Sequence, residues 1–177
     1  MENGCAGMGL EKPAESSREL PEPLTLLAEC FPDEVREASL SHGDAVAVVS
    51  PGALKRIMEF LKNDSRLLFN VLLDVTAVDY LGREPRFEVV YHLLSLPRSW
   101  RLRIKVKVSG EQPVLDSMAE LWESANWLER EVWDMFGIKF AGHPNLERIL
   151  LYPEFQGHPL RKDYPIRKRQ PLIGPKN

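Results

Sequence analysis

Cysteine is scarce in this 177-residue sequence, which contains only Cys5 and Cys30. An iron–sulfur cluster normally takes four cysteine thiolates, and a structural zinc site takes four Cys or His ligands. Two sulfurs are therefore too few for a cluster held by this chain alone. The sequence also lacks a Gly-x-Gly-x-x-Gly or P-loop pattern after any strand-like run, which argues against the usual nucleotide sites. We expect the chain to hold no cofactor and no metal of its own.

Long apolar runs are missing as well, and none approaches the roughly 18 residues that a membrane-spanning helix needs. Charge is spread unevenly: residues 1–37 hold nine acids and three bases, whereas residues 158–177 hold six bases and one acid. So acidic an N-terminal arm is unlike an Arg-rich transit peptide, and it has no apolar core of a secretory signal. We therefore expect a chain that does not cross a membrane and works in a bacterial cytoplasm.

Three parts of the sequence differ in composition. Residues 1–22 are rich in Gly, Pro and polar residues without apolar periodicity, which predicts a disordered acidic arm. Residues 23–152 contain the helix-like and strand-like patterns, and their length suits one α+β core domain. Residues 153–177 contain repeated prolines among many bases, which predicts an extended basic C-terminal tail rather than a helix.

Two helices are indicated in the first part of the core. Apolar residues recur at helical spacing over residues 24–31, and Pro32 should close that segment. Ser50 as N-cap, followed by Pro51 at the first helical position, predicts the start of a second helix. Its apolar residues then repeat at i, i+3, i+4 and i+7 and end near Asn63, so one face should pack on a core.

Four β-rich runs accompany these helices. A short one covers residues 44–50, and longer ones follow at residues 67–80, 86–96 and 100–109, separated by turn-forming or charged clusters. The three longer runs predict an antiparallel meander. In the last of them apolar residues alternate strictly with bases, so one face should pack and the other should be solvated. A βα unit followed by such a meander predicts the α+β class.

Two short helices are expected after the meander. Ser117 and Glu120 form a Ser-x-x-Glu capping box for the first of them. Asn126 with Glu129 repeats the device less perfectly for a helix over residues 127–136, and the glycine that follows should stop it. An irregular, extended C-terminal segment then completes the predicted fold.

The helix over residues 127–136 carries charges that could take part in chemistry. Glu131 and Asp134 lie three residues apart on a face away from the apolar stripe, and Arg130 stands four residues before Asp134 as a candidate ion-pair partner. Paired carboxylates could act in acid–base catalysis, contact a partner or simply face solvent. Because no nucleophile or substrate loop lies nearby in sequence, catalysis is the weakest of these three hypotheses.

His143 and His158 each lie in a Gly-His-Pro sequence. Their spacing matches no zinc pattern with a clear mechanism, and a proline after each histidine favours a fixed turn. We expect the imidazoles to bond to the backbone or to a partner. A metal site that combines them with Glu131 and Asp134 is the minor alternative.

The basic tail could suggest a nucleic-acid ligand. The chain is acidic overall, however, with a formal net charge of -3. The bases of the tail are also interspersed with prolines and Asp163, and they have no aromatic platform beside them. A protein partner with an acidic groove is therefore the favoured ligand.

A long ordered motif runs through "LEREVWDMFGIKFAGHPNLERILL" and continues in "GHPLRKDYP". It closely resembles the signature of the C-type (30 kDa-type) subunits of the proton-translocating NADH:quinone oxidoreductases (respiratory complex I). The runs "DVTAVDY", "RFEVVYHLLSL" and "LWESANWLERE" are also similar to this family, so the resemblance covers roughly residues 45–169.

The resemblance implies a peripheral-arm subunit on the cytoplasmic side of the bacterial inner membrane, packed against the quinone-site (D-type) subunit. It implies that electrons pass from NADH through FMN and iron–sulfur clusters to quinone within partner subunits, coupled to proton translocation. This chain would then serve in assembly, hold none of these cofactors and be non-catalytic by itself. The expected partner interface consists of signature residues: Glu129, Arg130, Glu131, Asp134, His143, Arg148, His158, Arg161, Lys162, Asp163 and Tyr164.

Two alternatives stay open at this point. Similar subunits occur in membrane-bound hydrogenases and in deazaflavin-dependent or plastid-type dehydrogenases, and the motif does not separate these complexes. An alternative of a different class is a stand-alone metal-dependent hydrolase that uses His143, His158 and the neighbouring carboxylates.

Overall fold

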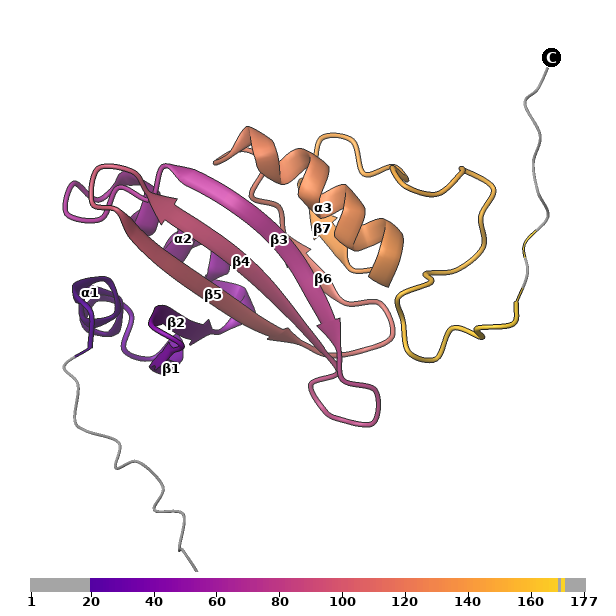
Figure 1. Ribbon diagram of the computed structural model, residues 1–177, viewed down its shortest axis with the longest axis horizontal. Helices are drawn as coiled ribbons and strands as arrows, with labels where there is room; N and C mark the ends of the chain where they lie inside the picture. Colours follow the sequence, from indigo (N-terminus) through magenta and orange to yellow (C-terminus); the bar gives the residue numbers. More distant parts are fainter. Residues whose placement is uncertain (1–19, 169, 171–177) are drawn as a thin grey trace, which may run out of the picture.

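The computed structural model describes residues 20–168 and residue 170 (Figure 1). The arm predicted over residues 1–22 falls almost entirely outside this part of the chain. The elements, in chain order, are α1 (Glu22–Cys30), β1 (Val35–Ser41), β2 (Asp44–Val49), the 3₁₀ turn η1 (Pro51–Ala53), α2 (Leu54–Asn63), β3 (Val71–Asp79), β4 (Phe87–Ser95), β5 (Trp100–Val108), β6 (Val114–Asp116), α3 (Glu123–Phe136) and β7 (Lys139–Ala141).

The main sheet has five strands in the order β1-β2-β5-β4-β3. β3, β4 and β5 are antiparallel neighbours, with Tyr91 paired to both Val75 and Ile104, so the predicted meander is confirmed. β2 joins the sheet parallel to β5, with Ala47 opposite Ile104. Helices and strands together give the α+β class that the sequence predicts.

The sequence patterns do not predict β1. Its residues mix charges with small side chains, so the apolar alternation of a half-buried strand is weak. β1 pairs with β2 as a hairpin whose two turn residues, His42 and Gly43, both have positive φ (55° and 92°). Such a turn matches the twist of the paired strands. Backbone pairing to β2, rather than side-chain periodicity, therefore makes this segment a strand.

One hydrophobic core collects side chains from all three helices and from the inward-facing positions of the sheet. The apolar stripe of α2, from Leu54 to Leu61, is fully buried, as its spacing predicts. Ser50 precedes the turn η1 instead of capping α2, and its side chain forms no capping hydrogen bond. On β5, Ile104 and Val106 are fully buried while the bases take the alternate positions, so the predicted alternation is confirmed.

A single helix, α3, replaces the two short helices expected after the meander. It runs from Glu123 to Phe136, so Asn126 lies inside it and caps nothing. The hydroxyl of Ser117 donates to the carboxylate of Glu129 instead of capping a helix of its own. A tertiary contact thus uses the two polar groups that the local capping pattern assigns to separate helix ends. The predicted stop at Gly137 is confirmed, with φ at 74°.

The chain beyond β7 contains no helix or strand in its described part, residues 142–168 and 170, which we call the C-terminal segment. It lies beside the end of α3, at the far end of the molecule from α1 (Figure 1). Its backbone bends through several turns, such as the one closed by the Tyr164 N–H and the Arg161 carbonyl. The division into arm, core domain and tail stays a prediction. None of the helices described here is long and apolar enough to span a bilayer.

Candidate partner-docking site

The C-terminal end of α3 is where the signature residues meet. The last carbonyls of a helix have no partner within the helix itself. Here the C-terminal segment supplies the donors. The contacts are His158 Nδ1 to Asp134 O at 3.0 Å, Leu160 N to Met135 O at 3.1 Å, and Arg161 Nε to Phe136 O at 2.5 Å.

Gly137 makes this close approach sterically feasible. Its φ of 74° lies in the left-handed region, which favours glycine at a helix end. A Cβ at this position would lie 2.5 Å from Cδ2 of His158. One glycine therefore both ends α3 and leaves room for the segment that caps it.

Asp134 is the buried anchor of the C-terminal segment. Its carboxylate, fully buried, accepts hydrogen bonds from Arg148 Nη1 at 2.5 Å and from the backbone amides of residues 149–151 at 3.0–3.1 Å. Burial by itself raises the pKa of a carboxyl group. Here the hydrogen bonds from the Leu151 amide and from Arg148 outweigh burial, and the pKa of Asp134 is lowered. The carboxylate is therefore charged and holds one loop of the segment in place.

The candidate ion pair between Arg130 and Asp134 is not formed. The guanidinium of Arg130 donates instead to the carbonyls of Glu147 and Arg148, at 3.0 and 3.1 Å. The physical reason is that Arg148 and the loop amides already occupy the carboxylate of Asp134. Arg130 thus also fastens the C-terminal segment, but through its backbone.

His143 fixes the first Gly-His-Pro turn, as predicted. Its Nδ1 accepts a hydrogen bond from the Asn145 amide, and its Nε2 lies 3.0 Å from the carbonyl oxygen of Asn126. Both ring nitrogens therefore contact the backbone of this chain.

A second anchor joins the C-terminal segment to the sheet, and the sequence analysis missed it. Asp79, almost fully buried at the end of β3, accepts two hydrogen bonds from Arg86 at 2.8 and 2.9 Å. The amide of Lys162 donates to the same carboxylate at 2.8 Å, and Asp163 contacts Arg86 at 2.9 Å. Arg86 is the main cause that lowers the pKa of Asp79. The sequence did offer a signal, because Asp79 continues the inward-facing alternation of β3. An acid at an inward-facing position needs a hydrogen-bonding partner within the fold.

Glu129 points into the core side of α3. It is fully buried and accepts hydrogen bonds from the Ser117 hydroxyl and the Met118 amide, both at 2.6 Å. Burial raises the pKa of Glu129 to about 7 despite these two donors. This residue therefore holds the turn that precedes α3.

The predicted interface residues are thus brought together mainly as contacts within this chain, and their contact with a partner stays a prediction. Buried ones are Glu129 and Asp134; half-buried ones are Arg130, His143, Arg148, His158, Arg161 and Tyr164; exposed ones are Glu131, Lys162 and Asp163.

Between these fastenings, the C-terminal segment turns apolar side chains toward solvent. Leu150 is 60% exposed, Leu160 is 53% exposed and Ile166 is 100% exposed. We call these three residues the apolar triplet. A partner that covered these side chains would remove apolar surface from water, which favours association.

A hollow of about 530 Å³ lies next to the end of α3. Burial, and to a lesser degree Arg161 and Arg148, lower the pKa of His158. The ring is therefore neutral at neutral pH, and with Nδ1 donating to a carbonyl its Nε2 can accept a hydrogen bond. The wall combines the cations Arg86, Lys139, Arg148 and Arg161, the acids Glu111 and Asp163, and Gln112, Trp133, Gly137 and His158.

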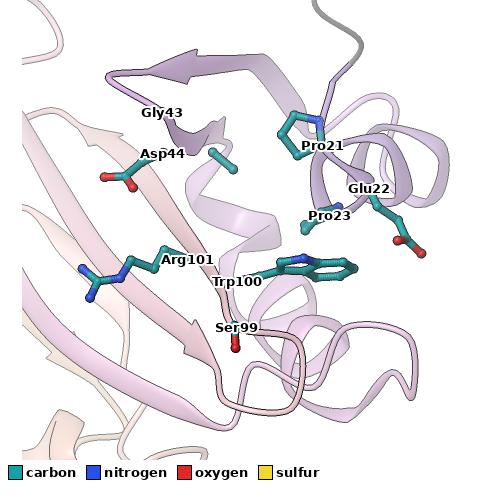
Figure 2. A pocket seen from close by; sticks show the side chains of 9 residues that line it. Pro21, Glu22, Pro23, Gly43, Asp44, Ser99, Trp100 and Arg101 are labelled. Atoms are coloured by element: carbon teal, nitrogen blue, oxygen red, sulfur yellow. The ribbon is translucent and has the colours of Figure 1, made fainter.

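Another hollow, of about 470 Å³, lies at the opposite end of the molecule beside α1. Figure 2 shows the Trp100 ring below Pro23. The charged ends of Asp44 and Arg101 point away from the space between Trp100 and Pro23. The polar groups of this second hollow do not converge on one point, so it offers no ligand site comparable to the hollow beside α3.

Comparison with known proteins gives consistent matches. The sequence pattern of the family described as "Respiratory-chain NADH dehydrogenase, 30 Kd subunit" matches residues 47–170. A C-type subunit of the NADH-quinone oxidoreductase of Rhizobium etli is 44% identical over 149 residues, which are 84% of this chain and 79% of that protein. The C-type subunit of the NADH-quinone oxidoreductase of Citrifermentans bemidjiense is 45% identical over 150 residues, 84% of this chain and 92% of that protein.

Solved structures agree with these sequence matches. A trypsin-resistant fragment of Nqo5 is 39% identical with a TM-score of 0.57, over 62% of this chain and 89% of that fragment. A chain of an archaeal membrane-bound sulfane sulfur reductase has a TM-score of 0.69 over 81% of this chain and 84% of its own length. That chain is only 24% identical to this one, so the likeness shows a shared fold alone.

Proposed function

Because this chain belongs to the 30 kDa subunit family of the respiratory-chain NADH dehydrogenases, we propose that it is an assembly subunit of an NADH–quinone oxidoreductase. It sits on the cytoplasmic side of the bacterial inner membrane and packs against the quinone-site subunit. Partner subunits hold FMN, the iron–sulfur clusters and quinone, and carry electrons from NADH to quinone coupled to proton translocation. This chain contributes a docking surface and no cofactor.

The observation that carries this proposal is how the signature residues are used. Asp134, Arg148 and Arg161 hold an irregular segment against α3, while the apolar triplet on that same segment faces water. A segment already fixed by its own chain loses little conformational freedom when a partner covers it. The signature therefore builds a rigid docking surface, which suits a subunit that positions others.

The hydrolase alternative has less support. His143 contacts the carbonyl of residue 126 and His158 that of residue 134, eight positions along α3. At about 1.5 Å per residue these carbonyls are separated by roughly 12 Å along the helix axis, too far for one metal ion. Asp134 is also saturated by hydrogen bonds from the chain itself.

Charge introduced into the apolar triplet tests the proposal. We expect the double variant Leu160→Asp with Ile166→Asp to lose assembly into the membrane-bound complex, because two carboxylates would be desolvated at the contact. The control is Leu96→Asp, which changes a leucine of the β4–β5 turn whose exposure, 60%, is close to the 53% of Leu160. Native gels of membranes that carry each variant in place of the wild-type chain measure the assembled fraction, and circular dichroism checks folding. Normal assembly of the folded double variant would refute a docking role for this surface.

A further inference from the structure

The hollow beside α3 contains one guanidinium that forms no ion pair within the described part of the chain. Arg86 forms ion pairs with Asp79 and Asp163, and Arg148 forms one with Asp134. Arg161 has no such pair with any residue that the structure describes; its donors reach only the carbonyls of Phe136 and Glu111. Arg86 and Arg148 are thus each paired with a carboxylate of this chain, whereas Arg161 is not.

The free donors of Arg161 are held in a fixed position. Its Nε bonds to the end of α3, its Nη2 lies 3.1 Å from the Glu111 carbonyl, and its guanidinium carbon lies 5.1 Å from the centre of the Phe87 ring. A guanidinium has five N–H donors, and these contacts leave several unused. Burial, followed by repulsion from Arg86, lowers the pKa of Arg161, although Asp163, Asp79 and Glu111 attract the guanidinium from a distance.

Lys139 adds a second cation on the same wall. Its ammonium group is exposed and forms only a long contact, 3.4 Å, with the amide oxygen of Gln112. Glu111 also lines the hollow, and it is the lining acid that has no ion-pair contact within the described chain. The uncompensated groups are therefore two cations and one carboxylate, which favours a ligand with a single negative charge over a multiply charged phosphate.

We propose that this hollow receives the carboxylate of an Asp or Glu side chain of the partner subunit, bound by Arg161 and Lys139. The inference rests on the proposed docking function. Leu160 of the apolar triplet is the residue before Arg161, so a partner that covers this leucine lies next to the segment that lines the hollow. Planar guanidinium donors suit a carboxylate, and the neutral His158 ring offers an acceptor to a neighbouring N–H of the partner.

Two charge changes among the residues that line the hollow test the proposal, because they should shift the affinity for the partner in opposite directions. Purified variants are titrated against the oxidoreductase subassembly isolated from a strain that lacks this chain. Lys139→Glu should weaken binding about tenfold or more, and Glu111→Gln should strengthen it about threefold, with both effects shrinking at high salt. The matched control is Arg101→Glu, which changes an exposed arginine at the start of β5 that does not line this hollow. This variant should leave the affinity unchanged.

The results separate this site from the docking function. Weaker binding of Lys139→Glu together with tighter binding of Glu111→Gln supports a carboxylate in the hollow. If both variants bind like the wild type while the Leu160→Asp, Ile166→Asp double variant does not bind, the carboxylate site is rejected and the docking surface stands. If Lys139→Glu tightens binding, the ligand is a cation and the proposal is overturned.

Discussion

The sheet with its helices and the C-terminal segment are held by different forces. In the first region, apolar side chains at helical or alternating spacing fill one core. In the second, buried acids, arginines and helix-end carbonyls form the contacts, with Asp134 and Asp79 at their centres. Apolar burial is non-directional and tolerates conservative exchange, whereas the loss of one partner of a buried ion pair leaves the other charge unpaired. The segment should therefore fail at single substitutions that detach it from an intact core.

The largest effect is expected from Asp134→Ala. Arg148 and three backbone amides would lose their acceptor, which should cost about 3–5 kcal/mol of stability and free the C-terminal segment. Limited proteolysis should then cut within residues 142–168 while circular dichroism still reports the sheet and helices. Leu61→Ala, a fully buried core position, should cost about 2–5 kcal/mol without preferential cleavage of the segment. Equal protease resistance of the two variants would contradict the view that the C-terminal segment can detach while the core stays folded.

The next effect concerns a carboxyl group buried on the core side of α3. The folded pKa of Glu129, about 7, is raised from the ordinary 4.5, so the native state binds the proton more tightly than the unfolded chain does. Stability from this group is therefore complete below about pH 4.5 and is lost as pH rises toward 7. Glu129→Gln should remove a decline of roughly 2–3 kcal/mol over that interval, measured by urea unfolding at several pH values. The exposed Glu131→Gln serves as control, and a pH profile of Glu129→Gln parallel to that of the wild type would contradict the assignment.

The smallest effect is expected from a pair of glycine variants. Their comparison distinguishes the cost of backbone strain from the loss of contacts between α3 and the C-terminal segment. Gly137→Ala places a side chain at φ 74° and a Cβ 2.5 Å from His158, whereas Gly43→Ala has a φ of 92° with no atom within 4 Å of the added Cβ. Left-handed strain alone costs roughly 1–2 kcal/mol in both variants. Gly137→Ala should therefore lower the melting temperature more than Gly43→Ala, and it alone should make residues 142–168 sensitive to protease. Identical behaviour of the pair would mean that the segment does not depend on its contact with Gly137.

Several elements could be predicted from the sequence because local rules decide them. The buried stripe of α2, the alternation on β5 and the stop at Gly137 follow from spacing and from backbone conformation. The signature motif likewise identifies the family, whose pattern covers residues 47–170. The helix starts at residues 117 and 126 were wrong because Ser117 and Glu129 bond to each other across a tertiary contact.

The apolar faces that fill the core, the α+β class and the family can therefore be derived from the amino-acid sequence, since each depends on residues that are neighbours along the chain or recur at a fixed period. The partners of the charged signature residues depend instead on how the chain folds. Asp134 bonds to Arg148 instead of Arg130, and Arg86 from the β3–β4 connection reaches Asp163 in the C-terminal segment. A buried carboxylate takes whichever donors the fold brings within about 3 Å, and sequence separation does not limit that choice.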